Sequence, residues 1–229
     1  MSKILLVAAV CAPFLLAAPA QASISLVTGL GDPASVVTGG TQVTFQGGPT
    51  GEHSTVTESG ITFTADSGVF ELSGQYSGLY NNQGVSLQGN FDGTEFQSLT
   101  ITFAAPVGAF AFNYGAADQF WLLQAFDSGG NLMGGFDLTP VNATNFGTFY
   151  GLASTGIGIS SARLFVDQAL ISGAAQNPDY IFVDNVTTGP VHEISPEGIP
   201  EPATWGMMIA GMGLVGAGLR RRAGKTLAA

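Results

Sequence analysis

Short apolar runs separated by turns, with no helical periodicity, fill the chain from Ser23 to Gly189. In Phe96–Phe103, apolar and hydroxyl side chains alternate, which is typical of an antiparallel strand with one face in solvent. Val107–Tyr114 has apolar side chains on both faces, which indicates a central strand. Turn residues recur about every 8–12 positions, and glycine is abundant. The pattern predicts an all-β domain.

Further runs rich in Val, Ile, Thr and Phe predict the other strands. They are Gln42–Gln46, Ile61–Ala65, Val69–Leu72, Phe120–Phe126, Leu132–Leu138, Arg163–Asp167 and Tyr180–Thr187. The turn-forming stretch from Asp127 to Asn131 joins two of these runs and predicts an antiparallel hairpin. Together the strands favour a two-sheet antiparallel β-sandwich of jelly-roll type.

The start of the chain has the parts of a secretory signal peptide. A basic beginning is followed by the apolar run Ile4–Ala18, and the small residues Ala20 and Ala22 then form a cleavage site. We predict that residues 1–22 are a signal peptide and that cleavage leaves Ser23 as the first residue of the mature protein.

Cysteine content and charge limit the chemistry of the exported domain. Cys11 is the only cysteine and lies in the predicted signal peptide, so the mature protein has no disulfide and no thiolate. Between Ser23 and Ile199, one Arg against fifteen Asp and Glu gives a net charge of −14. This charge repels nucleic acid, so we expect no nucleic-acid partner. It fits a soluble exported protein, a calcium-rich exterior, or a partner that is neutral or cationic.

The C-terminal tail, residues 200–229, has three parts in order. These are Pro200, Glu201 and Pro202, then the uncharged run Trp205–Leu219, then Arg220, Arg221 and Arg222. As a helix the run would measure roughly 22 Å, shorter than the ~30 Å hydrocarbon core of a bilayer. Trp205 and the arginines can anchor such a short span at the two interfaces, so we predict a single transmembrane helix with the arginines as a basic stop-transfer element. Since Lys and Arg prefer the cytoplasmic side, everything before the tail is expected outside the cytoplasm.

This tail resembles the PEP-CTERM sorting signal in its PEPxxWA variant, with Gly206 where that variant commonly has Ala. The resemblance covers about the last 30 residues. It implies that Pro200, Glu201 and Pro202, with Trp205 in the motif, are read by an exosortase of exopolysaccharide-producing Gram-negative bacteria. It also implies a temporary inner-membrane anchor on the periplasmic side, followed by processing for the cell surface. The processing chemistry belongs to the exosortase, so the resemblance passes no catalytic residue to this chain.

A second resemblance lies within the domain. The stretches Thr102–Phe110 and Val183–Val186 are similar to "T-F-x-x-P-V-x-A-F" and "V-D-N-V" stretches of the β-sandwich ectodomains of PEP-CTERM proteins. The resemblance implies that both stretches are core strands. We therefore expect a sandwich ectodomain over residues 23–189 and a Pro- and Gly-containing linker over residues 190–199.

No catalytic motif occurs in the sequence. His53 and His192, the only histidines, lie in separate segments, and neither G-x-S-x-G nor H-E-x-x-H is present. Paired carboxylates of a hydrolase carry no sequence signature, so a hydrolase stays open as an alternative. The candidate acids are Glu52, Glu58, Glu71 and Glu95.

Two kinds of binding site are compatible with the sequence. Calcium prefers carboxylate and carbonyl oxygens. The similarity to jelly-roll domains, which often place a structural ligand on the last strand, implies Asp184 as the best single candidate ligand. We expect no cofactor, with a structural calcium ion as the open alternative, and assign no metal-binding residue. Sugar binding needs exposed aromatic rings, for which Tyr76, Tyr80 and Trp121 are the candidates, although the apolar neighbours of Trp121 favour its burial.

These features favour an exported, non-enzymatic protein of the cell surface or exopolysaccharide matrix, with a structural or adhesive role. The first alternative is a carbohydrate-binding module that acts on the exopolysaccharide. The second is a secreted hydrolase, which requires two carboxylates roughly 5–10 Å apart in a cleft.

Overall fold

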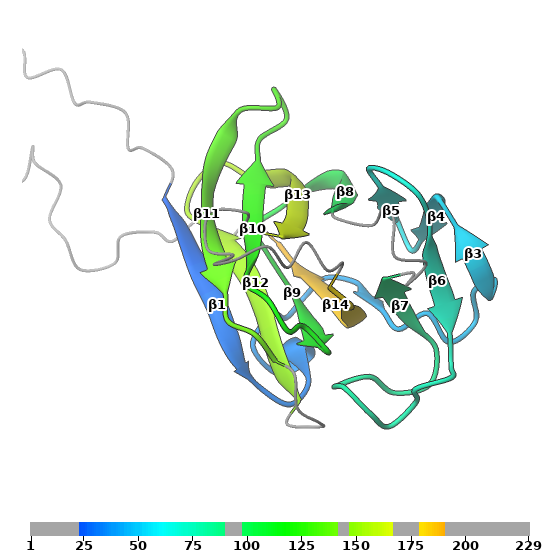
Figure 1. Cartoon of the computed structure of the whole chain (residues 1–229). Coiled ribbons are helices and arrows are strands. Elements are labelled where there is room, and N and C mark those ends of the chain that lie inside the picture. The colour runs from blue at the N-terminus through cyan, green and yellow to red at the C-terminus, as the bar shows by residue number, and fades with distance from the viewer. Residues whose placement is uncertain (1–22, 90–97, 142–146, 167–178, 191–229) are drawn as a thin grey trace, which may run out of the picture. The chain divides into compact units, whose positions relative to one another are not determined.

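The computed structural model describes residues 23–89, 98–141, 147–166 and 179–190 (Figure 1). The described elements are β1 (Ile24–Leu30), η1 (Pro33–Ser35, a 3-10 helix), β2 (Gln42–Val43), β3 (Gly51–His53), β4 (Thr55–Glu58), β5 (Ile61–Ala65), β6 (Phe70–Ser73), β7 (Ser86–Gly89), β8 (Ser98–Val107), β9 (Ala109–Gly115), β10 (Trp121–Phe126), β11 (Leu132–Leu138), β12 (Thr148–Ser154), β13 (Ile159–Val166) and β14 (Phe182–Gly189). The predicted signal peptide, linker and tail lie outside these residues. Among the described residues, no helix is long and apolar enough to cross a membrane.

The strands form two antiparallel sheets. Sheet A has the order β1-β12-β9-β14-β7-β6-β3, with β2 paired to β14, and sheet B has the order β11-β10-β13-β8-β5-β4. Figure 1 shows these strands as arrows, with β9 and β14 in the interior of sheet A. The predicted all-β, two-sheet antiparallel sandwich is confirmed.

The core lies between the two sheets. Phe103 on β8 contacts Phe110 on β9 with ring centroids 5.2 Å apart, so aromatic side chains of opposite sheets meet. Phe45 and Phe63 make a second edge-to-face contact at 5.1 Å. Trp121 is fully buried, as its apolar neighbours predict. One continuous apolar cluster therefore holds the sheets together.

Two strand predictions match the structure closely. The hairpin is formed by β10 and β11, with Trp121 opposite Leu138 and a bulge where Ala125 passes to Phe126. The central strand is β9, which pairs with β12 on one side and β14 on the other. Six of its seven residues, from Phe110 to Gly115, are buried. The turn residues from Asp127 to Asn131 made the hairpin visible in the sequence, and apolar side chains on both faces did so for the central strand.

Other strand predictions were incomplete. The run Gln42–Gln46 is a strand only at Gln42 and Val43, because Phe45 adopts a positive φ of 59°. The strand predicted from Arg163 begins earlier, at Ile159. The sequence pattern does not predict β1, β3, β4, β7 and β12. In β12 the interior Gly151 hides the strand pattern; it is required there because a Cβ would lie 1.9 Å from the carbonyl oxygen of Phe110.

A buried carboxylate joins the end of the core to two loops. Asp179, 5% exposed, accepts the indole N–H of Trp121 at 2.7 Å. It also accepts the backbone N–H groups of Asp118, Gln119 and Tyr180 at 2.9–3.0 Å. Four donors on one carboxylate fix the segment before β10 against the segment before β14.

We predict that Asp179→Ala lowers the free energy of unfolding by about 3 kcal/mol, because it leaves the buried indole N–H of Trp121 and three partly buried backbone N–H groups without their acceptor. Urea denaturation of the purified protein measures this loss. Trp121→Phe is the matched control: it removes one donor and keeps most of the ring, so it should cost less, about 1–2 kcal/mol. A larger loss in the Trp121 variant than in the Asp179 variant would contradict the assigned function of the carboxylate.

Candidate functional site

The outer face of sheet A is covered by polypeptide segments in place of a further sheet. Along β9, the side chains of Phe110, Phe112 and Tyr114 enter the core, so Asn113 must face the opposite side. The segment after β1 and the segment between β6 and β7 lie over this outer face, as the hydrogen bonds below show. Polar side chains on the face can therefore be buried and still find backbone partners.

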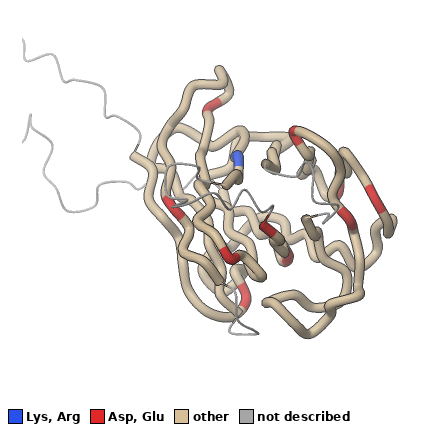
Figure 2. Tube along the Cα trace, in the orientation of Figure 1, with Lys and Arg blue, Asp and Glu red and all other residues tan. Residues whose placement is uncertain are grey.

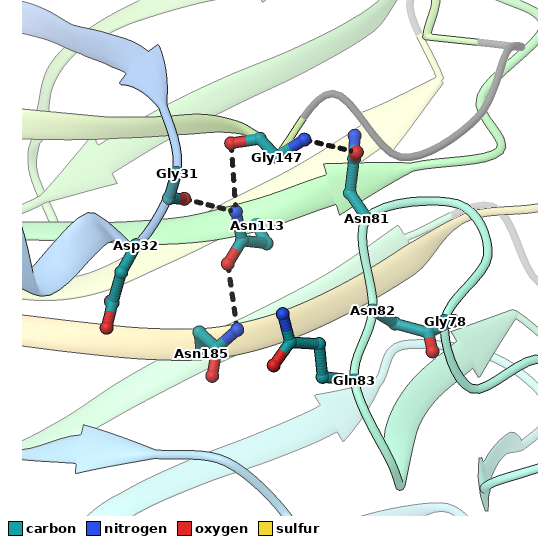
Figure 3. Close-up of a pocket in the computed structure, with 9 residues that line it drawn as sticks. All are labelled: Gly31, Asp32, Gly78, Asn81, Asn82, Gln83, Asn113, Gly147 and Asn185. Carbon is teal, nitrogen blue, oxygen red and sulfur yellow. Dashed lines mark hydrogen bonds between the residues drawn. The ribbon is translucent and has the colours of Figure 1, made fainter.

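Asn113 connects three segments. Its Nδ2 donates to the carbonyl oxygen of Gly31 at 2.9 Å and to that of Gly147 at 3.2 Å, while its Oδ1 accepts from Asn185 Nδ2 at 2.9 Å (Figure 3). These bonds link the end of β1, the start of β12 and β14. Asn185 sits in a bulge of β14 with a φ of 50°, between the residues that pair as Asp184↔Asn113 and Thr187↔Ala111.

Asn81 anchors the segment between β6 and β7. Its Nδ2 donates to the carbonyl oxygen of Tyr114 at 2.8 Å, and its Oδ1 accepts the backbone N–H of Gly147 at 2.7 Å. The segment approaches the end of β9 so closely that a Cβ at Gly115 would lie 1.9 Å from the carbonyl oxygen of Tyr80. Tyr80 and Asn81 both have positive φ, which turns the segment back over the sheet.

Asp184 fixes the same segment from β14. It is 1% exposed; its Oδ2 accepts the backbone N–H of Gln83 at 2.9 Å and its Oδ1 accepts that of Asn185 at 2.7 Å. Burial raises the pKa of Asp184 to about 7, and the nearby charge of Asp32 acts in the same direction, whereas the two backbone hydrogen bonds lower it. The carboxylate thus has a structural function, with an unusually high pKa.

These segments enclose a polar pocket of about 360 Å³. Its lining consists of glycines, carboxamides and one carboxylate: Gly31, Asp32, Gly78, Asn81, Asn82, Gln83, Asn113, Gly147 and Asn185 (Figure 3). Asp32 caps η1 by accepting the backbone N–H of Ala34 at 2.8 Å with Oδ1, which also accepts from Gln42 Nε2 at 2.9 Å. The pocket offers many groups that hydrogen-bond and few that carry charge.

Asn82 differs from the other asparagines of the pocket. It is 2% exposed, yet neither Oδ1 nor Nδ2 makes a hydrogen bond to any described residue. Its backbone groups are used: its N–H donates to Leu79 and its carbonyl oxygen accepts from Gly78. A buried amide without partners costs about 1–3 kcal/mol, so this side chain is not explained by the folding of the segment.

Two of the three predicted sugar-contacting aromatics lie together. Tyr76 and Tyr80 are half-buried, with ring centroids 6.0 Å apart, and both contact Phe182 on β14. Tyr180 completes this aromatic cluster, and burial raises its pKa to about 12. Trp121 does not belong to it. The aromatic cluster and the pocket share the segment between β6 and β7 and the strand β14.

The acids proposed for a hydrolase do not line this pocket. Glu52 and Glu71 lie directly opposite each other on β3 and β6. Glu58 ends β4, and burial raises its pKa. Glu95 and His192 lie outside the described residues. In the described part of the chain, no three His, Cys, Asp or Glu side chains are grouped so that they could hold a metal ion.

The calcium prediction stays a prediction. Both oxygens of Asp184 already accept a backbone N–H, and Asp32 is the one carboxylate that lines the pocket. The other oxygens there belong to neutral amides and backbone carbonyls, which calcium also accepts. This set of oxygens is poorer in negative charge than high-affinity calcium sites usually are.

Charged side chains are few and dispersed over the rest of the domain. Figure 2 shows acidic positions distributed over the domain, not gathered in one patch. Arg163 is the one Lys or Arg among the described residues; its Nε donates to Asp66 Oδ2 at 2.7 Å on sheet B. Partial burial raises the pKa of Asp66, but hydrogen bonds from Ser98, Thr100 and Arg163 and the charge of Arg163 outweigh this, so the net shift is downward.

Sequence reasoning identified Asp184 but not Asp32, Asn81, Asn82 or Asn113. One signal was present: Asn113 is the polar residue in a strand predicted to have little solvent on either face, so its amide needed buried partners. The partners of Asn113 belong to segments that are distant in the sequence, so no pattern around Asn113 could identify them.

Comparison with known proteins identifies the tail. Residues 198–222 match the family described as the PEP-CTERM protein-sorting motif, which confirms the resemblance drawn from its Pro-Glu-Pro triplet and indicates export and sorting to the cell surface. None of the curated proteins compared matches the chain.

Two solved structures illustrate the likeness of the domain to known folds. A mutant of a family 29 carbohydrate-binding module aligns at 10% identity over 79% of this chain and 93% of its own, with a TM-score of 0.30. A second mutant from family 29 aligns at 9% identity over 78% of this chain and 99% of its own, also with a TM-score of 0.30. A likeness at this level carries no argument about function.

We predict that the buried Asp184 makes stability fall as pH rises from about 4 to about 7. Over this range the unfolded carboxyl, with its ordinary pKa of 3.8, has lost its proton, while the folded one, with a pKa of about 7, keeps it. The loss should be on the order of 2–4 kcal/mol. Urea denaturation at several pH values should show it in the native protein but not in Asp184→Asn.

Asp32→Asn is the matched control for this prediction. It removes the neighbouring charge but retains the buried carboxyl, so the fall in stability should persist and move to lower pH in the same direction as the pKa of Asp184. Parallel pH profiles for the native protein and Asp184→Asn would show that this carboxyl does not titrate as inferred.

Proposed function

Because the chain carries a PEP-CTERM protein-sorting motif at residues 198–222, we propose that it is a structural or adhesive, non-enzymatic component of the cell surface or exopolysaccharide matrix. The sorting motif is the observation on which the proposal rests. It supports a surface location and processing by an exosortase, while the role of the ectodomain is inferred from its own residues.

The proposed route has three steps. The signal peptide, residues 1–22, directs export and is removed after Ala22. The apolar run Trp205–Leu219, stopped by its arginines, then holds the protein temporarily in the inner membrane with the ectodomain on the periplasmic side. An exosortase finally reads Pro200, Glu201 and Pro202 and releases the ectodomain toward the surface.

The ectodomain itself supports a structural role. Its large aromatic side chains close a continuous core, and its buried carboxylates Asp179 and Asp184 accept backbone N–H groups. A carboxylate that is almost fully buried and bonded in this way is poorly placed to contact a substrate. A rigid, strongly acidic domain suits a matrix component that must stay soluble during export.

Carbohydrate binding is the second candidate function. It is favoured by the polar pocket on sheet A, together with the half-buried pair Tyr76 and Tyr80 beside it. Carboxamides hydrogen-bond with hydroxyl groups, and aromatic rings pack against the apolar faces of sugars. This function is compatible with the first, because an adhesive matrix protein needs a polymer to hold.

We predict that Glu201→Gln prevents processing. In cells that contain an exosortase, the native chain should lose its tail and reach the surface fraction, whereas the Glu201 variant should lose only the signal peptide, keep its tail and stay in the inner membrane. Fractionation followed by mass spectrometry of a tagged chain measures both. Glu197→Gln, one residue outside the matched motif, is the control and should behave as the native chain does.

The proposal fails if Glu201→Gln leaves both mass and location unchanged. It also fails if the control variant is retained as strongly as the Glu201 variant, since the effect would then reflect the loss of any acid near the membrane.

A further inference from the structure

Four strands end the two described sheets, and β1 differs from the other three. β3 and β4 are three and four residues long, and each contains a glutamate. β11 is longer and contains Asp137. β1, with the sequence ISLVTGL, is seven residues long and has neither a charged residue nor a proline. Short length, charge and proline keep the edge of a sheet from pairing with another chain, and β1 has none of these protections.

The direction of the backbone groups of β1 follows from its pairing with β12. The carbonyl oxygen of Ser23 accepts the N–H of Thr155 at 3.1 Å. At the other end, the N–H of Gly31 donates to the carbonyl oxygen of Gly147 at 2.8 Å. Because backbone groups alternate between the two sides of a strand, the odd-numbered residues face β12. The even-numbered residues, whose N–H and C=O groups point away from β12, are Ile24, Leu26, Thr28 and Leu30.

These outward groups form an open edge. β12 is the one described strand that pairs with β1, and Figure 1 shows no arrow beyond β1 on that side of sheet A. The side chains of Thr28 and Leu30 are exposed, that of Leu30 at 71%. A row of backbone donors and acceptors beside an exposed leucine is a surface that another extended strand can complete.

The edge is complementary to a second copy of itself. In an antiparallel pair centred on Val27, Ile24 of one copy lies opposite Leu30 of the other. Leu26 then lies opposite Thr28. These are the residues whose backbone groups point outward, so all four donors and all four acceptors find partners. Paired residues share one face of a sheet, so Ile24 of one copy covers the exposed Leu30 of the other.

The charges near the edge favour the same partner. In this register, the position before Ser23 lies opposite the exposed Asp32 of the second copy. When cleavage after Ala22 leaves Ser23 first, as proposed above, the N-terminal ammonium points toward that position and attracts the carboxylate. Repulsion between the acidic side chains dispersed over two copies (Figure 2) is screened beyond about 10 Å at 0.1 M ionic strength.

We propose that the β1 strands of two copies of this chain pair as antiparallel strands about a two-fold axis at Val27, which joins their A sheets into one continuous sheet. The contact goes beyond the proposed function and does not depend on the sorting motif. It gives a matrix component a means of associating with itself. One strand pair buries less than a standard interface of about 1,600 Å², so the dimer should be weak, with a dissociation constant of roughly 10–100 µM.

Disulfide trapping in the full mature chain tests the register, because no cysteine follows the predicted signal peptide. In the proposed dimer the two Val27 residues form a non-hydrogen-bonded pair with Cα atoms about 4.5 Å apart, which a disulfide can bridge. The two Ser25 residues are offset by roughly 13 Å along the strands, which it cannot bridge. In detergent at micromolar concentration and in a glutathione redox buffer, Val27→Cys should therefore form disulfide-linked dimers at least about ten times faster than Ser25→Cys. Non-reducing gels measure both rates.

Two edge variants in the Val27→Cys chain show whether pairing of β1 causes the cross-link. Thr28→Pro removes an N–H that points away from β12, and Leu30→Glu places an acid at an exposed position. Each should slow cross-linking at least about threefold and leave the melting temperature nearly unchanged. Leu30→Glu keeps the test decisive if Thr28→Pro does not fold. Thr57→Cys, at an exposed position of the edge strand β4, measures the rate of chance collisions.

Two results would overturn the proposal. The first is that Val27→Cys forms dimers no faster than Ser25→Cys or Thr57→Cys, since the chains would then not meet in this register. The second is a rate of cross-linking that stays unchanged in either folded edge variant, which would mean that the copies associate through another surface. Neither result bears on the sorting proposal, which the Glu201 variant tests separately.

Discussion

The structure depends on hydrogen bonds from buried side chains to distant backbone groups on the outer face of sheet A. Asn113, Asn81 and Asp184 tie the ends of β1 and β12 and the segment between β6 and β7 to the central strands. Such bonds are needed because no third sheet covers this face: the covering segments have backbone groups that would otherwise be buried without partners. Sheet B closes the opposite face chiefly through the apolar core, with the Asp179 carboxylate bonded to Trp121 at its edge.

This arrangement explains why the pocket lies where it does. Covering segments held by a few side chains cannot fill the face as densely as a packed sheet does, and the space left between them is lined by the same polar residues. Asn82 is carried in on a segment that Asn81 and Asp184 anchor on either side, so its amide is held in place without being used.

The strands that could be predicted are those whose signal is local. The hairpin of β10 and β11 contains a strong turn, and the central strand β9 is a continuous apolar run that is buried on both faces. The strands that were missed take their conformation from their partners: β12 contains Gly151 where the backbone of β9 approaches, and β3 and β4 are only three and four residues long. Pairing with a neighbouring strand stabilises the extended conformation of these segments, although their own sequences carry no strand pattern.

By itself, the sequence determined the export signals and the fold class, because contiguous residues carry both. A Pro-Glu-Pro triplet, an apolar run and an arginine cluster work as a linear motif, and alternation along a strand reports which faces are buried. Only the tertiary structure decided the pocket. It brings Gly31, Asn82 and Asn185 together from three parts of the chain, and such proximity arises from strand order and register, which are long-range properties.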